Sequence, residues 1–261
     1  KFAKSKRTVL LVEDNQDLLN VLIPLLAVDY NVLGAGNGQE AIKLLSSYDI
    51  DLVVSDVMMP EMDGFELCSY IKSNIETSSI LVLLLTVKSQ DEDRNFGYKS
   101  GVDGYMTKPF KPYLLKSRIA GLFNNRDKLI QQFKNRDVIT IKELNYTTLD
   151  EKFLSKAIQI VEEHIDNPEF NFDLFVDEIG VTKSTLYRKI KTMTGLTTSD
   201  FIKNIRLKKS CDILRKGISN IAEVAYAVGF NDPKYFTKCF KREFGITPSE
   251  YLRKRNLKPV E

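Results

Sequence analysis

Residues 83–110 read LLLTVKSQDEDRNFGYKSGVDGYMTKPF and contain the features that decide the fold. An apolar run stops at Thr86, and a second short run, GYMT, stops just before Lys108. Short apolar runs separated by a helix-length segment are typical of neighbouring strands in a parallel sheet. This stretch therefore predicts a hydroxyl group and an ammonium group at the same edge of such a sheet.

The same alternation of short apolar runs and helical segments extends over residues 8–123. The runs are TVLLV (8–12), NVLGA (31–35), DLVVS (51–55), ILVLLL (80–85) and GYMT (104–107). Because amphipathic segments such as QEAIKLLSSY separate them, we predict a five-stranded parallel sheet with helices on both faces, the doubly wound (flavodoxin-like) α/β class. Within the first helical pattern, LLNVLIPLLAV, we expect a bend or short break at Pro24, since proline lacks the backbone donor.

Acidic side chains follow two other predicted strands. Glu13 and Asp14 come after the first run, and Asp56 comes after the third. Since ligands of such sheets bind beyond the carboxyl ends of the strands, these carboxylates should meet Thr86 and Lys108 there. Crowded carboxylates repel one another unless a cation neutralises them, and their oxygens suit Mg²⁺. The pattern predicts a magnesium site at which Asp56 accepts a phosphoryl group.

Over residues 6–124 the chain resembles the receiver domain of two-component response regulators, with VEDN, SDVMMPEMDG, LLLT and KPF in the family's order and spacing. The resemblance implies that Asp56 is the phospho-acceptor. It also implies that Asp14 and Asp56 bind Mg²⁺ directly, that the Met58 carbonyl is a backbone ligand, and that Glu13 acts through water.

The remaining receiver residues take their expected roles from the same resemblance. Thr86 and Lys108 would bind phosphoryl oxygens, and Tyr105 would turn inward when Thr86 moves toward the phosphoryl group. Val87 stands where the family usually has alanine or glycine. Its extra methyl groups would narrow access to the site and slow phosphotransfer, hydrolysis or both.

Composition sets outer limits on the function. The 261 residues, 43% apolar and 28% charged, describe a globular chain of about two domains. Cys68, Cys211 and Cys239 form no metal-spaced pair, which indicates reduced thiols in a cytoplasmic protein. His164 is the one histidine of the chain. The sequence therefore offers almost no histidine for a zinc site or for histidine-based general-acid catalysis.

Charge is distributed unevenly along the chain. Residues 1–124 carry 13 basic and 16 acidic side chains, and residues 125–180 carry 7 and 12. Residues 181–261 carry 18 basic and only 7 acidic side chains. A basic excess confined to the last third makes a polyanion a serious candidate partner for that region.

Two segments in the second half share one layout. FVDEIGVTKSTLYRKIKTMTG and IAEVAYAVGFNDPKYFTKCFKREFG each contain a short helical stretch, a turn at Gly180 or Gly229, and a second helical stretch. This is the helix-turn-helix plan, whose second helix can lie in the major groove of DNA. A long helix over residues 201–217 would hold the two units about one turn of B-DNA, ~34 Å, apart.

The second helix of each unit has an apolar and a polar face. Leu186 and Ile190 are four residues apart, as are Phe236 and Phe240, so these pairs should point inward. Side chains on the opposite faces can reach base edges or phosphates. The candidate contacts to double-stranded DNA are Lys183, Ser184, Tyr187, Arg188, Lys191, Lys234, Tyr235 and Lys238.

Residues 150–255 resemble the DNA-binding domain of AraC-family regulators, most strongly in GFNDPKYFTKCFKREFGITPSEY (229–251). Lys238 departs from the arginine common at its position, which weakens the case for bidentate reading of guanine. We predict a receiver domain (1–124), a linker (125–150), an AraC-type all-α domain with two helix-turn-helix motifs (151–255) and a tail (256–261).

This domain order resembles the C-terminal end of hybrid two-component regulators, in which a sensor and a histidine kinase precede these parts. Because the sequence begins at Lys1, we expect a piece of a longer chain. The resemblance implies that the parent protein is anchored in the inner membrane. The resemblance implies a phosphorylation-controlled, sequence-specific transcription regulator that induces carbohydrate-use genes, not an enzyme beyond its own phosphotransfer and dephosphorylation. Its expected partners are Mg²⁺, DNA, a histidine kinase domain and a second copy of the chain.

Two alternatives stay open at this point. An aspartyl-phosphate hydrolase also uses an aspartate nucleophile with Mg²⁺, but such enzymes typically place a second acid two residues later, where this chain has Met58. A receiver that never cycles phosphate could serve as an adaptor or dimerisation module. Incubation with a small phosphodonor separates the three possibilities.

Overall fold

The computed structural model describes residues 2–3, 5–87, 101–135, 148–217 and 220–256. The chain divides into two compact units: residues 1–128 with 146–150, and residues 129–145 with 151–261. All of these divisions lie within or at the end of residues 125–150, the predicted linker. The limits of the predicted domains themselves stay a prediction.

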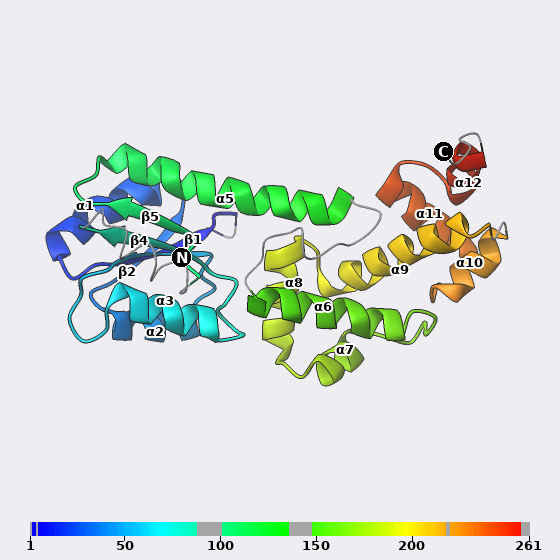
Figure 1. The fold of residues 1–261 in the computed structure, drawn as a ribbon, viewed down its shortest axis with the longest axis horizontal. Coiled ribbons are helices and arrows are strands. Elements are labelled where there is room, and N and C mark those ends of the chain that lie inside the picture. Colours follow the sequence, from blue (N-terminus) through cyan, green and yellow to red (C-terminus); the bar gives the residue numbers. More distant parts are fainter. Residues whose placement is uncertain (1, 4, 88–100, 136–147, 218–219, 257–261) are drawn as a thin grey trace. The chain divides into compact units, whose positions relative to one another are not determined.

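The first unit contains one five-stranded sheet (Figure 1). Its strands are β1 (Thr8–Val12), β2 (Asn31–Ala35), β3 (Leu52–Asp56), β4 (Leu81–Thr86) and β5 (Gly104–Thr107). All pairs are parallel, and the strand order is β2-β1-β3-β4-β5. The predicted doubly wound α/β fold is confirmed. In this order, β2 is added on one side of β1, and β3, β4 and β5 are added on the other side. At such a switch point, here between β1 and β3, a crevice forms beyond the carboxyl ends of the strands.

Alternate residues of β1 face the two sides of the sheet, as a period of two requires. Val9 and Leu11 pack with α1 and α5, whereas Leu10 and Val12 pack with α2 and α3. All four side chains are at most 2% exposed, which is why the strand reads as an unbroken apolar run. The helices are α1 (Gln16–Ala27), α2 (Gly38–Ser47), α3 (Gly64–Ser73) and α5 (Pro112–Asn135).

Helix α1 runs without interruption through Pro24. The expected short break is therefore wrong, whereas a bend at this position stays a prediction. Residues 88–100, in the helix-length segment between the runs LLLT and GYMT, lie outside the described residues.

The second unit is helical in its described residues. It comprises the end of α5 from Leu129, α6 (Thr148–Glu163) from Glu151, α7 (Phe172–Ile179), α8 (Lys183–Thr194), α9 (Thr198–Arg215), α10 (Ile221–Ala227), α11 (Pro233–Phe244) and α12 (Pro248–Asn256). Helices α7–α8 and α10–α11 are the two predicted helix-turn-helix pairs, and α9 leads from one to the other (Figure 1). At 1.5 Å per residue, the 18 residues of α9 extend about 27 Å.

Left-handed glycines end the helices at the turns. Gly180 has φ +76° after α7, and Gly229 has φ +73° in the turn between α10 and α11. Both conformations suit glycine because it lacks a Cβ atom. The inward-facing pairs are confirmed: Leu186, Ile190, Phe236 and Phe240 are each 0% exposed.

None of the described helices is both long and apolar enough to cross a membrane.

Candidate functional site

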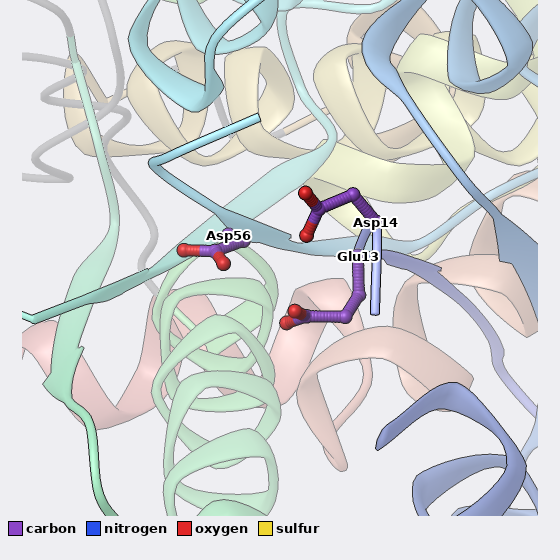
Figure 2. Close-up of side chains that lie close together, drawn as sticks. All are labelled: Glu13, Asp14 and Asp56. Atoms are coloured by element: carbon purple, nitrogen blue, oxygen red, sulfur yellow. The ribbon is translucent and has the colours of Figure 1, made fainter. Parts of the chain in front are cut away.

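Three carboxylates meet at the carboxyl edge of the sheet. Glu13 and Asp14 follow β1, and Asp56 is the last residue of β3 (Figure 2). One carboxylate oxygen from each of the three lies within 4.8 Å of the others. Glu13 and Asp56 are buried, whereas Asp14 is exposed. We call Glu13, Asp14, Asp56 and Lys108 the acidic pocket.

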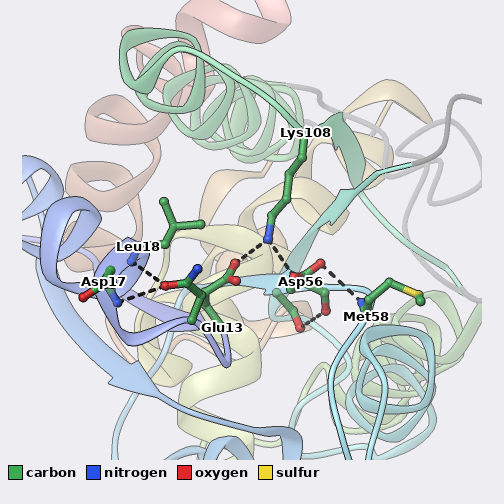
Figure 3. Close-up of polar contacts among 8 residues, drawn as sticks. Glu13, Asp17, Leu18, Asp56, Met58 and Lys108 are labelled. Atoms are coloured by element: carbon green, nitrogen blue, oxygen red, sulfur yellow. Dashed lines mark hydrogen bonds and ion pairs between the residues drawn. The ribbon is translucent and has the colours of Figure 1, made fainter.

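Lys108 reaches into the pocket from the loop after β5 (Figure 3). Its Nζ atom donates to Glu13 Oε2 and to Asp56 Oδ2, both at 2.6 Å. The other Asp56 oxygen, Oδ1, accepts from the Met58 backbone N–H at 3.3 Å. One cation thus serves two buried carboxylates, which leaves the three acids short of positive charge.

The pKa values in the pocket follow this arrangement. Burial raises the pKa of Glu13 above its ordinary 4.5, and the hydrogen bond from Lys108 only partly opposes it. Burial lowers the pKa of Lys108, but its hydrogen bonds to Asp56 and Glu13 outweigh burial and raise the pKa overall. Lys108 is therefore charged at neutral pH, whereas placing full negative charge on Glu13 costs free energy.

The residues of the pocket fit a magnesium ion. Three carboxylates from adjoining strand ends provide an all-oxygen donor set of high negative charge, which Mg²⁺ prefers over nitrogen or sulfur. Asp14 is exposed, so the ion's remaining positions would face solvent and keep water, as Mg²⁺ requires. The donor set therefore agrees with the expected cofactor.

The other residues predicted for the receiver site lie nearby or at strand ends. Thr86 ends β4 and is buried, and its backbone carbonyl accepts from the Lys108 N–H at 2.7 Å. Tyr105 lies in β5, half-buried, and packs against the core cluster shared with α2 and α3. The Met58 side chain is 71% exposed, so its predicted contribution is confined to the backbone.

Val87 lines a pocket next to the acidic pocket. The cavity is about 380 Å³ and is lined by Leu18, Val87, Lys108, Pro109 and Phe110. Val87 itself is 65% exposed. Val87 and Lys108 thus line the same cavity. The expected restriction of access to Asp56 by Val87 stays a prediction.

Two residues that the sequence reading did not single out shape this site. The Asn15 side chain accepts from the N–H groups of Asp17 and Leu18 at 3.0 and 3.1 Å, and so fixes the turn that carries Asp14. An Asn directly before a helical pattern is a cap signal that could have identified it.

The second residue is Gly64, the first residue of α3. A Cβ atom there would lie 2.3 Å from the Asp56 carbonyl oxygen and 2.9 Å from the Val57 Cα atom. Its N–H donates to the Val57 carbonyl at 3.0 Å. Glycine is thus required for α3 to pack directly against the backbone of Asp56, and the sequence alone does not reveal this contact.

The predicted DNA contacts of the first helix-turn-helix lie on α8. Lys183, Ser184, Tyr187 and Lys191 are exposed, and Arg188 is half-buried. Lys183 Nζ lies 2.5 Å from Asp173 Oδ1 of α7, and this hydrogen bond raises the pKa of Lys183.

On α11 the predicted contacts are Lys234, Tyr235 and Lys238, and all three are exposed. The Asp232 side chain caps the helix by accepting from the Lys234 N–H at 2.8 Å. Lys238 and Tyr235 also line a cavity of about 420 Å³ with Lys241 and Arg242. Each second helix thus presents cations and a tyrosine on the face opposite its buried apolar pair. We call α8 and α11 the recognition helices.

Comparison with known families finds a match in each part of the chain. Residues 9–120 match the response regulator receiver domain, and residues 175–254 match a helix-turn-helix domain. The chain is 35% identical over 208 residues to the probable transcriptional regulator ycf29 of Porphyra purpurea, covering 77% of this chain and 98% of that protein. The chain belongs to the response-regulator family, with a receiver domain and a helix-turn-helix domain of the AraC type in one polypeptide.

A longer relative and a solved structure were also found. The chain is 44% identical over 248 residues to histidine kinase P4 of Formosa agariphila, covering 95% of this chain. The chain spans only 18% of the length of that relative. The chemotaxis protein CheY4 of Vibrio cholerae matches with a TM-score of 0.44 and 28% identity, over 45% of this chain and 99% of that one.

Proposed function

We propose that the protein is a transcription regulator in which phosphorylation of Asp56 controls sequence-specific DNA binding by α8 and α11. The observation that carries this proposal is the acidic pocket: three carboxylates whose oxygens lie within 4.8 Å, with Lys108 2.6 Å from two of them. Carboxylates crowded together in this way, two of them buried, are stabilised by a cation, and a phosphoryl group on Asp56 would change the local charge directly.

Each residue of the pocket has a defined task in the transfer. An Asp56 carboxylate oxygen attacks the phosphorus of a phosphohistidine; the P–O bond forms as the P–N bond breaks, and the imidazole nitrogen keeps the electron pair. Lys108 is already hydrogen-bonded to Asp56, and its ammonium group then binds the negatively charged phosphoryl oxygens. Mg²⁺ bound by Asp14, Asp56 and the Met58 carbonyl, with Glu13 acting through water, would supply further positive charge.

The change then reaches Thr86 and Tyr105. Once Asp56 is phosphorylated, the phosphoryl oxygens compete with the Glu13 carboxylate for the hydrogen bonds of Lys108. The Thr86 hydroxyl moves toward the phosphoryl group as well. Tyr105 turns inward as Thr86 moves. Phosphorylation shifts the chain between two states only if it binds one of them better, and the DNA-competent state is the favoured one.

The phosphoryl donor is a histidine kinase domain. The similarity to histidine kinase P4, of which this chain spans 18%, supports a donor in the same parent polypeptide, which would be anchored in the inner membrane. A second copy of the chain is the proposed partner on DNA.

Incubation with acetyl phosphate and Mg²⁺ tests the proposal. The wild-type chain should gain acid-labile phosphate, whereas Asp56→Asn and chelator-treated protein should gain none. Acetyl phosphate consumed catalytically without a bound phosphoryl group would favour a hydrolase. A wild-type chain that gains no phosphate would favour the adaptor that never cycles phosphate.

A further inference from the structure

Arg206 joins three separate parts of the second unit. It lies in α9, and its side chain is only 7% exposed. Nη1 donates to the carbonyl oxygen of Gly229 at 3.1 Å, and Nη2 donates to the carbonyl oxygen of Asn167 at 2.5 Å. The guanidinium group of Arg206 therefore links α9 to two turns that lie 62 residues apart in the sequence.

Both acceptors lie at positions that orient a helix-turn-helix. Gly229 forms the left-handed turn between α10 and α11, with φ +73°. Asn167 lies in the turn after α6, four residues before Asn171, which caps α7 by accepting from the N–H groups of its first turn. Arg206 thus holds the turn of the second unit against the turn that leads into the first.

The junction is closely packed. A Cβ atom at Gly229 would lie 2.6 Å from the carbonyl oxygen of Ile165 and 2.8 Å from Arg206 Cζ. Glycine is therefore needed at 229 for its backbone conformation and also for the approach of Arg206. Contacts this tight leave the two turns little freedom to shift relative to each other.

Elsewhere the two helix-turn-helix pairs pack against different parts of α9. Phe201, near the start of α9, stacks with Phe175 of α7 at a centroid distance of 6.2 Å. Cys211 and Leu214, near its end, belong to the core cluster of α10 and α11. Arg206 lies between these regions, and it spans them with directed hydrogen bonds instead of apolar contact.

Placing a charged group here has an energetic cost. Burial lowers the pKa of Arg206, although a guanidinium stays protonated in proteins. Two hydrogen bonds to carbonyl oxygens offset that cost, and the planar fork of arginine can reach both acceptors at once. A lysine ammonium group is a point charge and does not reproduce the fork.

We infer that Arg206 is a positioning residue that sets the separation of α8 and α11, and with it the spacing of the two DNA segments that the protein reads. This inference rests on the proposed function as a DNA-binding regulator. Arg206 is too deeply buried to contact DNA itself, so its effect is on geometry and not on charge at the interface.

The test uses the whole chain and a duplex selected by the wild-type protein from a random pool. A series of duplexes then carries one to five extra base pairs between the two protected segments. The wild type should lose about tenfold or more in affinity once base pairs are inserted, because the segments rotate away from fixed helices. Arg206→Lys, which keeps the charge, should bind the original duplex about tenfold more weakly and discriminate between spacings by less than about twofold.

Lys203→Ala is the matched control, since Lys203 is on the same helix and pairs with Asp200 within it. Lys203→Ala removes one positive charge from α9, and its affinity for DNA should depend on the spacing in the same way as that of the wild type. Circular dichroism and thermal unfolding establish that each variant is folded. Arg206→Gln replaces Arg206→Lys if the latter unfolds.

Three outcomes would overturn the inference. Arg206→Lys with an unchanged spacing profile would show that the fork is not needed. An equal loss at every spacing, with a shallower salt dependence, would show a phosphate contact instead. If the wild type selects no duplex, DNA binding itself fails and the inference falls with it.

Discussion

In the acidic pocket of the first unit, Glu13 and Asp56 are 3% and 6% exposed and share the hydrogen bonds of one lysine. On the recognition helices of the second unit, by contrast, Tyr187 and Tyr235 are 49% and 48% exposed, and lysines surround them. In the pocket, charges interact at short range in a buried site. The recognition helices present exposed cations and tyrosines to solvent.

The two sites should therefore respond differently to substitutions and to salt concentration. Changes to the pocket should act through packing, burial and pKa, and should depend little on salt. Changes to the recognition helices should act through the partner and depend strongly on salt, because binding to DNA releases counterions.

The largest expected effect on stability is at Gly64. Gly64→Ala should lower the free energy of unfolding by about 3 kcal/mol, the upper end of what overpacking costs, because the new Cβ atom meets the backbone of Asp56 and Val57. Denaturant titration measures this value. The matched control is Gly121→Ala in α5, where an added Cβ atom would meet no atom of the described residues within 4 Å outside the neighbouring helix backbone, and alanine should stabilise the helix by about 1 kcal/mol. Equal effects at both glycines would contradict the close packing of α3 on the phospho-acceptor.

On the recognition helices, Arg188 and Lys234 should separate base reading from phosphate binding. Arg188→Ala should weaken DNA binding by about 1–3 kcal/mol and relax the preference at one base pair. Lys234→Ala should weaken binding evenly across sequences and reduce the salt slope by about 1. Competition binding with single-base variants of the operator at several salt concentrations distinguishes the two. A uniform loss for Arg188→Ala would assign it to a phosphate.

The pocket should also give a dependence of stability on pH. Because burial raises the pKa of Glu13 above its unfolded value of 4.5, the folded state binds more protons in the interval between the two values. In the absence of Mg²⁺, the contribution of Glu13 to the free energy of unfolding should therefore rise as the pH falls through its folded pKa toward 4.5. Denaturant titration of the wild type and Glu13→Gln isolates this contribution, since other acids titrate in both. If the free energies of unfolding of the wild type and of Glu13→Gln change in parallel with pH, the raised pKa of Glu13 in the folded state is contradicted.

The smallest expected effect is at Val87. Val87→Ala widens the rim of the pocket that Lys108 also lines, and should shorten the lifetime of the phosphoryl group by a few-fold at most. Following the decay of acid-labile phosphate measures the lifetime. Leu18→Ala, in α1 and lining the same cavity, provides the comparison. Equal lifetimes in the wild type and Val87→Ala would remove any role for the valine.

Much of this organisation could be predicted from the sequence, for a physical reason. A parallel sheet buries both faces of its strands, so β1 and β4 read as unbroken apolar runs whose ends are easily located. The convergence of Glu13, Asp14, Asp56 and Lys108 follows from the ends of β1, β3 and β5, which lie at the same edge of the sheet. The apolar pairs of α8 and α11 were predictable in the same way, because a spacing of four residues defines a helix face.

What could not be predicted depends on contacts between distant segments. The break expected at Pro24 is wrong, because α1 continues through it and packs Leu22 and Leu26 into the core on either side. The contact of Gly64 with Asp56, and the two hydrogen bonds of Arg206, arise only once separate elements are packed together. Sequence periodicity describes each element alone and carries no information on such contacts.

The central claim is that phosphorylation of Asp56 changes DNA binding. The most direct measurement is the affinity of the wild type and of Asp56→Asn for the selected duplex, with and without acetyl phosphate and Mg²⁺. The phosphodonor should tighten binding by the wild type about tenfold, within the range of typical coupling between sites, and leave Asp56→Asn unchanged. A wild type that gains phosphate with no change in affinity, or an equal change in Asp56→Asn, would contradict it.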